Sequence, residues 1–327
     1  MRIKETVLCG ILAVTLVLGV RPAWVAAQEA GFPSKPVTII VPFGPGGIID
    51  VGARIFSDRL SKELKVPVVV ENKAGGAGLV GATAFMNMNP DGYALLAASG
   101  AAVISAVQLS KNPAFDPRKD MLPVGYLADA PCAMAVGKNT PFNSFNEFLQ
   151  YAKSNPGKLR GAVASLGGET HIMFESIVRD AKIDSKMVPY PAIGGLITAV
   201  LGGHVDWWCG TMPVALPYHK SGDMRVLLLT RKSAELPGVP SGTDAGFPDI
   251  SVNAWMGLFA HSKTPKPIHD KLVAAVSNMI KDPELAKKLS ATGFNVAYKN
   301  PAEFGKLIED QWGIYARIIK EANIKVE

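Results

Sequence analysis

The chain has 327 residues, with 34 Lys and Arg against 28 Asp and Glu, and its formal net charge is +6. Its basic residues are scattered among acids, without a basic run or interleaved aromatic residues. This distribution excludes nucleic acid as an expected partner. Residues 28–327 are enough for two ordinary domains, each with a core of its own.

The first 27 residues have the layout of a secretory signal peptide. Arg2 and Lys4 precede an apolar run over residues 7–20, and small residues follow at 25–27. The run is shorter than the about 20 residues that a membrane span needs, so a retained signal anchor is the alternative. We therefore expect residues 1–27 to be removed and the mature protein to be periplasmic. Cys132 and Cys209 remain in that protein, either as a disulfide or as two buried free thiols.

After residue 36 the chain alternates strands and helices, as α/β proteins do. The first cycle predicts strands at residues 37–41, 66–70 and 94–98, and helices at 49–64, 79–88 and 101–109. The second cycle predicts strands at 159–164, 187–190, 205–209 and 225–230, with helices at 145–154, after 168, and at 193–201. The tail predicts helices at 267–280, 283–289 and 301–322, each with a proline at its start.

Two long extended stretches, 122–136 and 250–260, can each carry the chain from one domain to another. We therefore predict an α/β protein of two lobes with a cleft between them. Lobe 1 would comprise residues 28–127 and 255–327, and lobe 2 residues 128–254.

Glycine-rich turns precede four of the predicted helices, two in each lobe. They lie at residues 44–47, 74–78, 165–170 and 193–195. Glycine leaves the N–H groups at a helix N-terminus bare, and such an end favours a carboxylate or another anion. In open α/β sheets these turns lie at the carboxyl ends of strands, where ligands bind. The pattern predicts an anion site that needs no basic side chain.

Other chemistries fit the sequence less well. Residues 76–81 match G-x-G-x-x-G, but no acid stands about 20 residues on, as a dinucleotide site requires. His171 with Ser165, Cys132 or Cys209 would resemble a hydrolase pair, yet there is no G-x-S-x-G elbow. The remaining histidines lack metal-ligand spacing. We expect no catalytic residue, no cofactor and no metal.

The sequence also resembles a known family. The signature runs from Pro33-Ser34-Lys35-Pro36 to Pro42-Phe43-x-Pro45-Gly46-Gly47-x-x-Asp50, and further matches follow in order along the mature chain. Among them are residues 69–78, 90–93, 188–190, 201–206, 237–240, 255–260 and 264–267. These residues resemble the Bug-type receptors, the extracytoplasmic solute-binding proteins of tripartite tricarboxylate transporters.

The resemblance implies a fold, a function and a site. The fold would be a two-lobed periplasmic binding protein of the type II, Venus-flytrap kind with two crossover strands. The protein would be a monomer that closes on a small carboxylate and delivers it to the membrane permease subunits. Carried onto this chain, the binding residues are Phe43, Gly46, Gly47, Ile48, Ile49, Asp50, Ser165, Gly167, Gly168, Glu169, Thr170, Tyr190, Ile193, Gly194 and Trp208.

Departures from the family pattern bear on the ligand. Ile48 and Ile49 stand where relatives have small or hydroxyl residues, Gly168 replaces a Ser or Thr, and Glu169 adds an acid. The site thus loses hydroxyls and gains bulk, which predicts a monocarboxylate with an apolar or aromatic body. Trp207 or Trp208 would form an aromatic wall against it, the alternative being that either one packs in the core. The alternatives are a secreted Ser or Cys hydrolase and the binding subunit of a signalling system.

Overall fold

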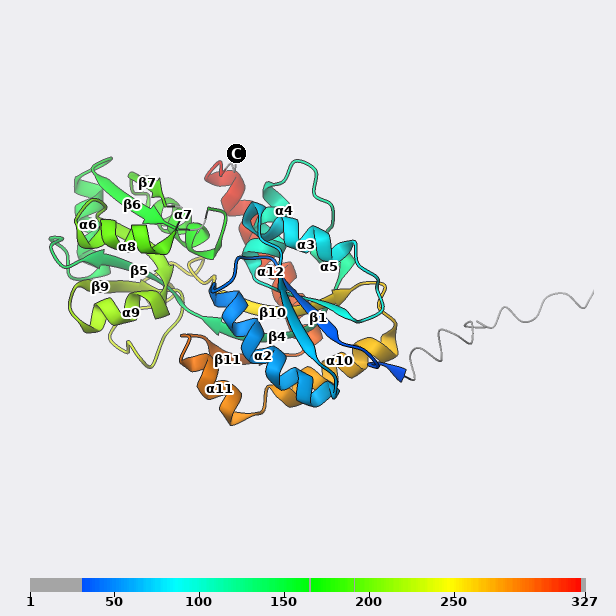
Figure 1. The fold of residues 1–327 in the computed structure, drawn as a ribbon. Coiled ribbons are helices and arrows are strands. Elements are labelled where there is room, and N and C mark those ends of the chain that lie inside the picture. The colour runs from blue at the N-terminus through cyan, green and yellow to red at the C-terminus, as the bar shows by residue number, and fades with distance from the viewer. Residues whose placement is uncertain (1–30, 165, 191, 325–327) are drawn as a thin grey trace, which may run out of the picture.

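The computed structural model describes residues 31–324 except 165 and 191. It is built on two sheets, which define two lobes (Figure 1). The sheet of lobe 1 has the strand order β11-β4-β10-β3-β1-β2, and the sheet of lobe 2 has the order β7-β6-β8-β5-β9. The expected two-lobed α/β fold is therefore confirmed.

Lobe 1 draws its elements from both ends of the described chain. Its strands are β1 (Val37–Val41), β2 (Val68–Asn72), β3 (Ala94–Ala98), β4 (Met121–Ala130), β10 (Ala254–His261) and β11 (Asn295–Lys299). Its helices are α2 (Ile48–Leu64), η1 (Gly76–Gly78), α3 (Leu79–Met86), η2 (Ala101–Ser105), α4 (Ala106–Leu109), α5 (Pro117–Asp120), α10 (Lys266–Met279), α11 (Pro283–Ser290) and α12 (Pro301–Glu321).

Lobe 2 is formed by one continuous stretch of the chain. Its strands are β5 (Cys132–Gly137), β6 (Leu159–Val163), β7 (Ser185–Pro189), β8 (Trp207–Thr211) and β9 (Met224–Leu229). Its helices are α6 (Phe145–Ser154), α7 (Glu169–Ala181), α8 (Ile193–Leu201) and α9 (Met212–Lys220).

The two sheets repeat one arrangement. In each, three parallel strands stand in the order second, first, third, and an antiparallel strand that leads to or from the other lobe pairs with the third. Those strands are β10 in lobe 1 and β5 in lobe 2. β4 runs almost directly into β5, and its last residue, Ala130, pairs with Ala254 at the start of β10. The two crossovers therefore lie side by side between the lobes.

Helices cover both faces of both sheets, which explains why the strands are apolar on both sides. In lobe 1, one core cluster includes residues of α2, α10 and α11, and the other includes residues of α3, η2 and α12. In lobe 2, α6 and α7 contribute to one cluster and α8 and α9 to the other. Within the described residues no helix is both long and apolar enough to cross a membrane.

Several elements differ from the sequence prediction. β2 begins at Val68 rather than at residue 66, and the predicted helix at 101–109 is a π-helix that continues as α4. Three elements carried no clear periodic signal, namely α5, α9 and β11. Cys132 and Cys209 are free and buried, so the structure has no disulfide between them.

Candidate functional site: the cleft between the lobes

The carboxyl ends of the parallel strands of the two lobes lie close to each other. In lobe 1, Ala101 follows β3 and the two residues Ser99 and Gly100. In lobe 2, Glu169 is the first residue of α7, the helix that follows β6. The backbone N–H of Ala101 donates to Oε1 of Glu169 over 3.2 Å. Because this bond joins the two strand edges, we infer that the glycine-rich turns of both lobes face a common cleft, where open α/β sheets bind ligands.

The helices that start at this cleft lack side-chain caps. The residues before α2, α7 and α8 are Gly47, Gly168 and Ala192, and none of them accepts a capping bond through its side chain. By contrast, side chains cap α5, α6, α11 and α12, which start elsewhere. α9 and α10 also lack a side-chain cap, and both begin with a proline in the first turn. The N–H of Glu169 bonds its own carboxyl group, and the other first N–H groups of α2, α7 and α8 are left for a ligand or for water.

Asp50 braces the first loop from inside. It is only 2% exposed, and it accepts hydrogen bonds from the backbone N–H of Gly46 at 2.9 Å and from the amide of Asn72 at 2.8 Å. Arg54 donates to both carboxylate oxygens. Burial alone would raise the pKa of Asp50, but the bonds from Arg54, Gly46 and Asn72 outweigh it and lower the pKa. Asn72 also donates to the carbonyl oxygen of Phe43, so the loop is held at both ends.

The structure separates the predicted first-loop residues into two groups. Gly46 and Gly47 are exposed, and Gly46 has a φ of 77°, which favours glycine. Ile48 is half-buried. The side chains of Ile49 and Asp50 are buried, Ile49 in the lobe-1 core and Asp50 among its hydrogen-bond partners. Contrary to the expectation, neither side chain is placed to contact a ligand. Phe43 is half-buried and packs against both core clusters of lobe 1.

The predicted lobe-2 residues lie on the loops before α7 and α8. Gly167, Gly168 and Glu169 are buried, while Thr170 is half-buried. Gly194 is exposed and Tyr190 is half-buried, and Ile193 is 40% exposed. Ser165 lies outside the described residues. Leu166 lies within the predicted turn at 165–170 but was not named as a binding residue, and it is 37% exposed.

His171 has a structural role, contrary to the hydrolase alternative. Its Nδ1 accepts a 2.8 Å bond from the backbone N–H of Gly167, and its Nε2 lies 3.4 Å from Oε1 of Glu175. Burial raises the pKa of the Cys132 and Cys209 thiols, whereas a nucleophilic cysteine needs a lowered pKa. Among the described residues, no cluster of three or more His, Cys, Asp or Glu side chains could hold a metal ion.

The aromatic wall predicted from Trp207 and Trp208 is wrong in this structure. Both side chains are 0% exposed and point to opposite faces of β8, as strand geometry requires. Trp207 stacks on Phe174 with ring centroids 4.3 Å apart, and its Nε1 donates to Ser185. Trp208 lies in the core cluster under α8 and α9. Because helices cover both faces of the sheet, neither indole reaches the cleft.

Glu169 is surrounded by groups from lobe 1. Burial raises the pKa of Glu169, while hydrogen bonds from its own backbone N–H, from Ala101, from the Ser99 hydroxyl and from Gly100 oppose that change. Ser99, Gly100 and Tyr315 also lie around the Glu169 carboxyl group, and the sequence did not predict them as site residues. Ser99 and Gly100 lie between a strand and a helix, as the predicted glycine-rich turns do, so the same sequence pattern could have identified them. Tyr315 lies in the middle of α12 and carried no such pattern.

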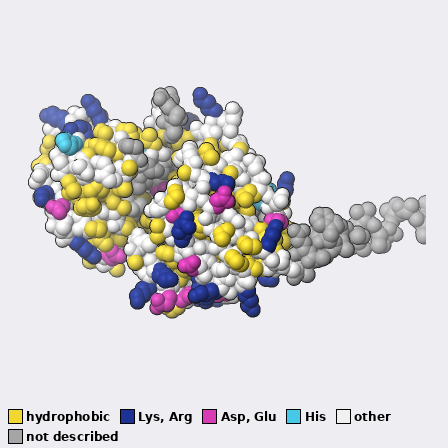
Figure 2. All heavy atoms as spheres, in the orientation of Figure 1, with side chains coloured by type: hydrophobic (Ala, Val, Ile, Leu, Met, Phe, Trp, Pro, Cys, Tyr) yellow, Lys and Arg dark blue, Asp and Glu magenta, His cyan; other side chains and the backbone are white. Residues whose placement is uncertain are grey.

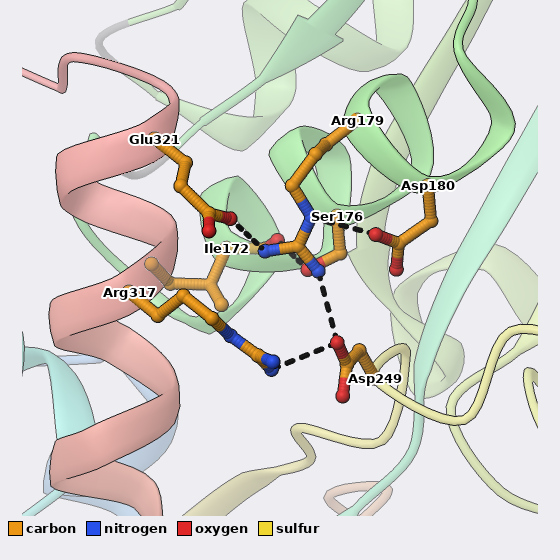
Figure 3. A network of polar contacts seen from close by, with 7 residues as sticks. All are labelled: Ile172, Ser176, Arg179, Asp180, Asp249, Arg317 and Glu321. Atoms are coloured by element: carbon orange, nitrogen blue, oxygen red, sulfur yellow. Dashed lines mark hydrogen bonds and ion pairs between the residues drawn. The ribbon is translucent and has the colours of Figure 1, made fainter.

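One face of α7 is attached to lobe 1 along its length. Glu169, Ile172 and Arg179 lie at helical spacing, so they share a face. Ile172 belongs to the core cluster of lobe 1 that includes α12. Arg179 donates to Glu321 of α12 over 3.0 Å and to Asp249 over 3.1 Å (Figure 3). The helix that carries Glu169 is thus held to lobe 1 at its start, middle and end.

Charge elsewhere on the surface is mixed. On the face drawn in Figure 2, both Lys or Arg and Asp or Glu side chains are spread over the surface. A hollow of about 640 Å³ is lined by Arg179, Arg317, Asp249, Glu321 and their neighbours. Arg317 donates to Asp249 over 2.8 Å, so the charged groups of this hollow already pair with one another. These pairs make this hollow a poorer candidate for a carboxylate site than the uncapped helix ends.

Comparison with known proteins agrees with this fold. The model of the family called the tripartite tricarboxylate transporter family receptor, TctC, matches residues 52–324. The chain belongs to this family. Its members are solute-binding receptors and not enzymes, which confirms the expected class.

Three relatives show how far the likeness extends. BugT of Bordetella pertussis is 29% identical over 300 residues, which cover 90% of this chain and 92% of BugT. The structure of MatC from Rhodopseudomonas palustris with bound malate is 30% identical, with a TM-score of 0.74, and the match covers 88% of this TctC-family chain and all of MatC. A second R. palustris protein, solved with adipate, is 25% identical, with a TM-score of 0.78 and coverage of 90% and 99%.

Proposed function

We propose that this TctC-family receptor captures a small carboxylate in the cleft between its lobes and delivers it to the permease of a tripartite transporter. One observation carries the proposal. The helices that start at the cleft, α2 and α7–α8, come from opposite lobes and lack side-chain caps. A carboxylate between them would accept N–H bonds from both lobes and so stabilise the closed state more than the open one.

The side chains at the cleft favour a solute with an apolar body. Ile48 is half-buried at the first loop, and Leu166 and Ile193 are partly exposed on the facing loops. Arg54, at the first loop, is already bonded to Asp50 and Asn72. Such a lining suits an apolar or aromatic monocarboxylate better than a polyanion, which would need more donors than these loops supply.

The cellular site is proposed from the sequence and the relatives. Residues 1–27 have the signal-peptide layout but lie outside the described residues. Solved relatives of this chain are periplasmic proteins. We infer that the mature receptor works in the periplasm and meets its permease there.

A thermal-shift screen of residues 28–327 tests this function. The panel holds aromatic and aliphatic monocarboxylates, dicarboxylates, citrate and the matching amides. A solute present at about 100 times its dissociation constant adds about 2.7 kcal/mol of stability, a shift of several degrees at this size. We expect shifts with apolar or aromatic monocarboxylates and none with their amides. Shifts with amides alone would contradict carboxylate binding, and shifts with citrate alone would contradict the apolar solute.

A further inference from the structure

Two lobe-1 groups and one lobe-2 carboxyl group converge above Gly100. A methyl group placed on Gly100 would lie 2.9 Å from the Tyr315 hydroxyl, 3.2 Å from Oε1 of Glu169 and 3.4 Å from Nε1 of Trp255. Trp255 already donates to Gln311, at 2.9 Å. The Tyr315 hydroxyl is fully buried and has no hydrogen-bond partner among the described residues. A buried hydroxyl without a partner is costly, and here it faces the same small volume as the Glu169 carboxyl group.

The lobe-1 groups around this volume are hydrogen-bond donors suited to a carboxylate. The backbone N–H of Ala101 donates to Glu169, and the Ser99 hydroxyl and the backbone of Gly100 lie near enough to its carboxyl group to oppose the rise of its pKa. Ser99 is only 6% exposed. A carboxylate accepts several bonds of this kind at once. Lobe 1 therefore presents a carboxylate position beside the cleft, and a side chain of lobe 2 fills it.

Glu169 also connects this position with the cleft. It is the first residue of α7, whose uncapped N–H groups border the cleft. Its side chain leaves from that helix end and runs into lobe 1. Truncation of the side chain would thus open the position toward the bound solute. The α7 face that includes Ile172 and Arg179 holds the backbone of Glu169 in place independently of its carboxyl group.

We propose that Glu169 supplies, from within the chain, the carboxyl group that a dicarboxylate solute would otherwise place against Ser99, Ala101 and Tyr315, and that it thereby restricts the receptor to solutes with one carboxylate. The inference rests on the proposed function and names the residue that sets its solute class. Relatives solved with malate and adipate hold dicarboxylates, so a restriction of this kind separates this chain from them.

Calorimetric titration with hexanoate and adipate tests the inference, because the two acids have the same carbon chain and differ by one carboxylate. Glu169→Ala empties the position, Glu169→Gln keeps it filled, and Glu235→Ala removes an exposed acid of lobe 2 as a control. We expect the wild type to prefer hexanoate. Glu169→Ala should gain at least about tenfold in adipate affinity, with hexanoate affinity changed by less than about threefold. Glu169→Gln and Glu235→Ala should bind both acids as the wild type does.

Acetate provides a second measurement on the same variants. It should raise the melting temperature of Glu169→Ala by refilling the position, and the rise should exceed the one that binding in the cleft gives the wild type and Glu169→Gln. If Glu169→Ala does not fold, Glu169→Ser takes its place in both measurements. Absence of a gain for adipate in the truncated variant overturns the inference, as does a wild type that prefers adipate. Failure of the proposed function gives a different result, because the folded wild type then binds neither hexanoate nor adipate. Even in that case, a gain in adipate affinity for Glu169→Ala would support the inference about Glu169.

Discussion

Replacement of Asp50 by alanine is expected to lower the free energy of unfolding by about 2–4 kcal/mol and to weaken solute binding at least about tenfold. The change removes a buried carboxylate that accepts bonds from Gly46, Arg54 and Asn72. The N–H of Gly46 and the amide of Asn72 would then be left without this partner. Because the same bonds shape the first loop, its helix N-terminus would no longer be held against the cleft. Urea unfolding and calorimetric titration measure the two effects.

The lowered pKa of Asp50 adds a dependence on pH. A carboxyl group with a lowered pKa in the folded state contributes stability that is fully present above its ordinary value of 3.8. This contribution is lost as the pH falls from that value through the lowered one. The difference in stability between wild type and Asp50→Ala should therefore shrink in acid. Asp58→Ala, which removes an exposed acid of the same helix, should unfold like the wild type at neutral pH. An Asp50→Ala variant that does the same would contradict the brace.

Replacement of Gly81 by alanine is expected to destabilise the protein by about 1–3 kcal/mol and to impair binding. A Cβ at this position of α3 would meet the carbonyl oxygen of Lys73 and would lie 2.6 Å from the Cα of Pro42. Both are backbone atoms of the loops that follow β2 and β1, so no side-chain rotation can make room. The helix would have to move away from the loops that border the cleft. Thermal unfolding and titration with the best monocarboxylate measure the outcome.

Gly313→Ala is the matched control for this prediction. Gly313 lies inside α12, and a Cβ there would meet nothing within 4 Å. Since alanine has the higher helix propensity, this substitution should stabilise the protein by up to about 1 kcal/mol. Equal effects of the two substitutions would show that close packing at Gly81 does not matter.

Local patterns in the sequence predicted most of the fold. The alternation of apolar strands with helices, and the two long extended stretches, were sufficient to predict two lobes. The glycine-rich turns also predicted where helices begin without caps. Elements without a periodic pattern were missed. One of them is β11, which pairs with β4 although all of lobe 2 lies between these two strands in the sequence.

The roles of single side chains were harder to predict, because they depend on partners far along the chain. The family resemblance implied that Asp50 binds the ligand, but its carboxylate accepts a bond from Asn72, 22 residues away. Alternation along β8 placed Trp207 and Trp208 on opposite faces, yet only the structure shows that helices cover both. Glu169 was noted as an added acid, and its contact with Ala101, 68 residues away, could not be foreseen.

A crystal structure of the mature protein with the monocarboxylate that gives the largest thermal shift tests the central claim most directly. We expect the solute carboxylate within hydrogen-bond distance of the first N–H groups of α2 and of α7 or α8. Its apolar body should contact Ile48, Leu166 or Ile193, and Glu169 should remain bonded to Ala101. A solute held by basic side chains in the hollow beside Arg179 and Arg317, with the cleft filled only by water, would contradict the account.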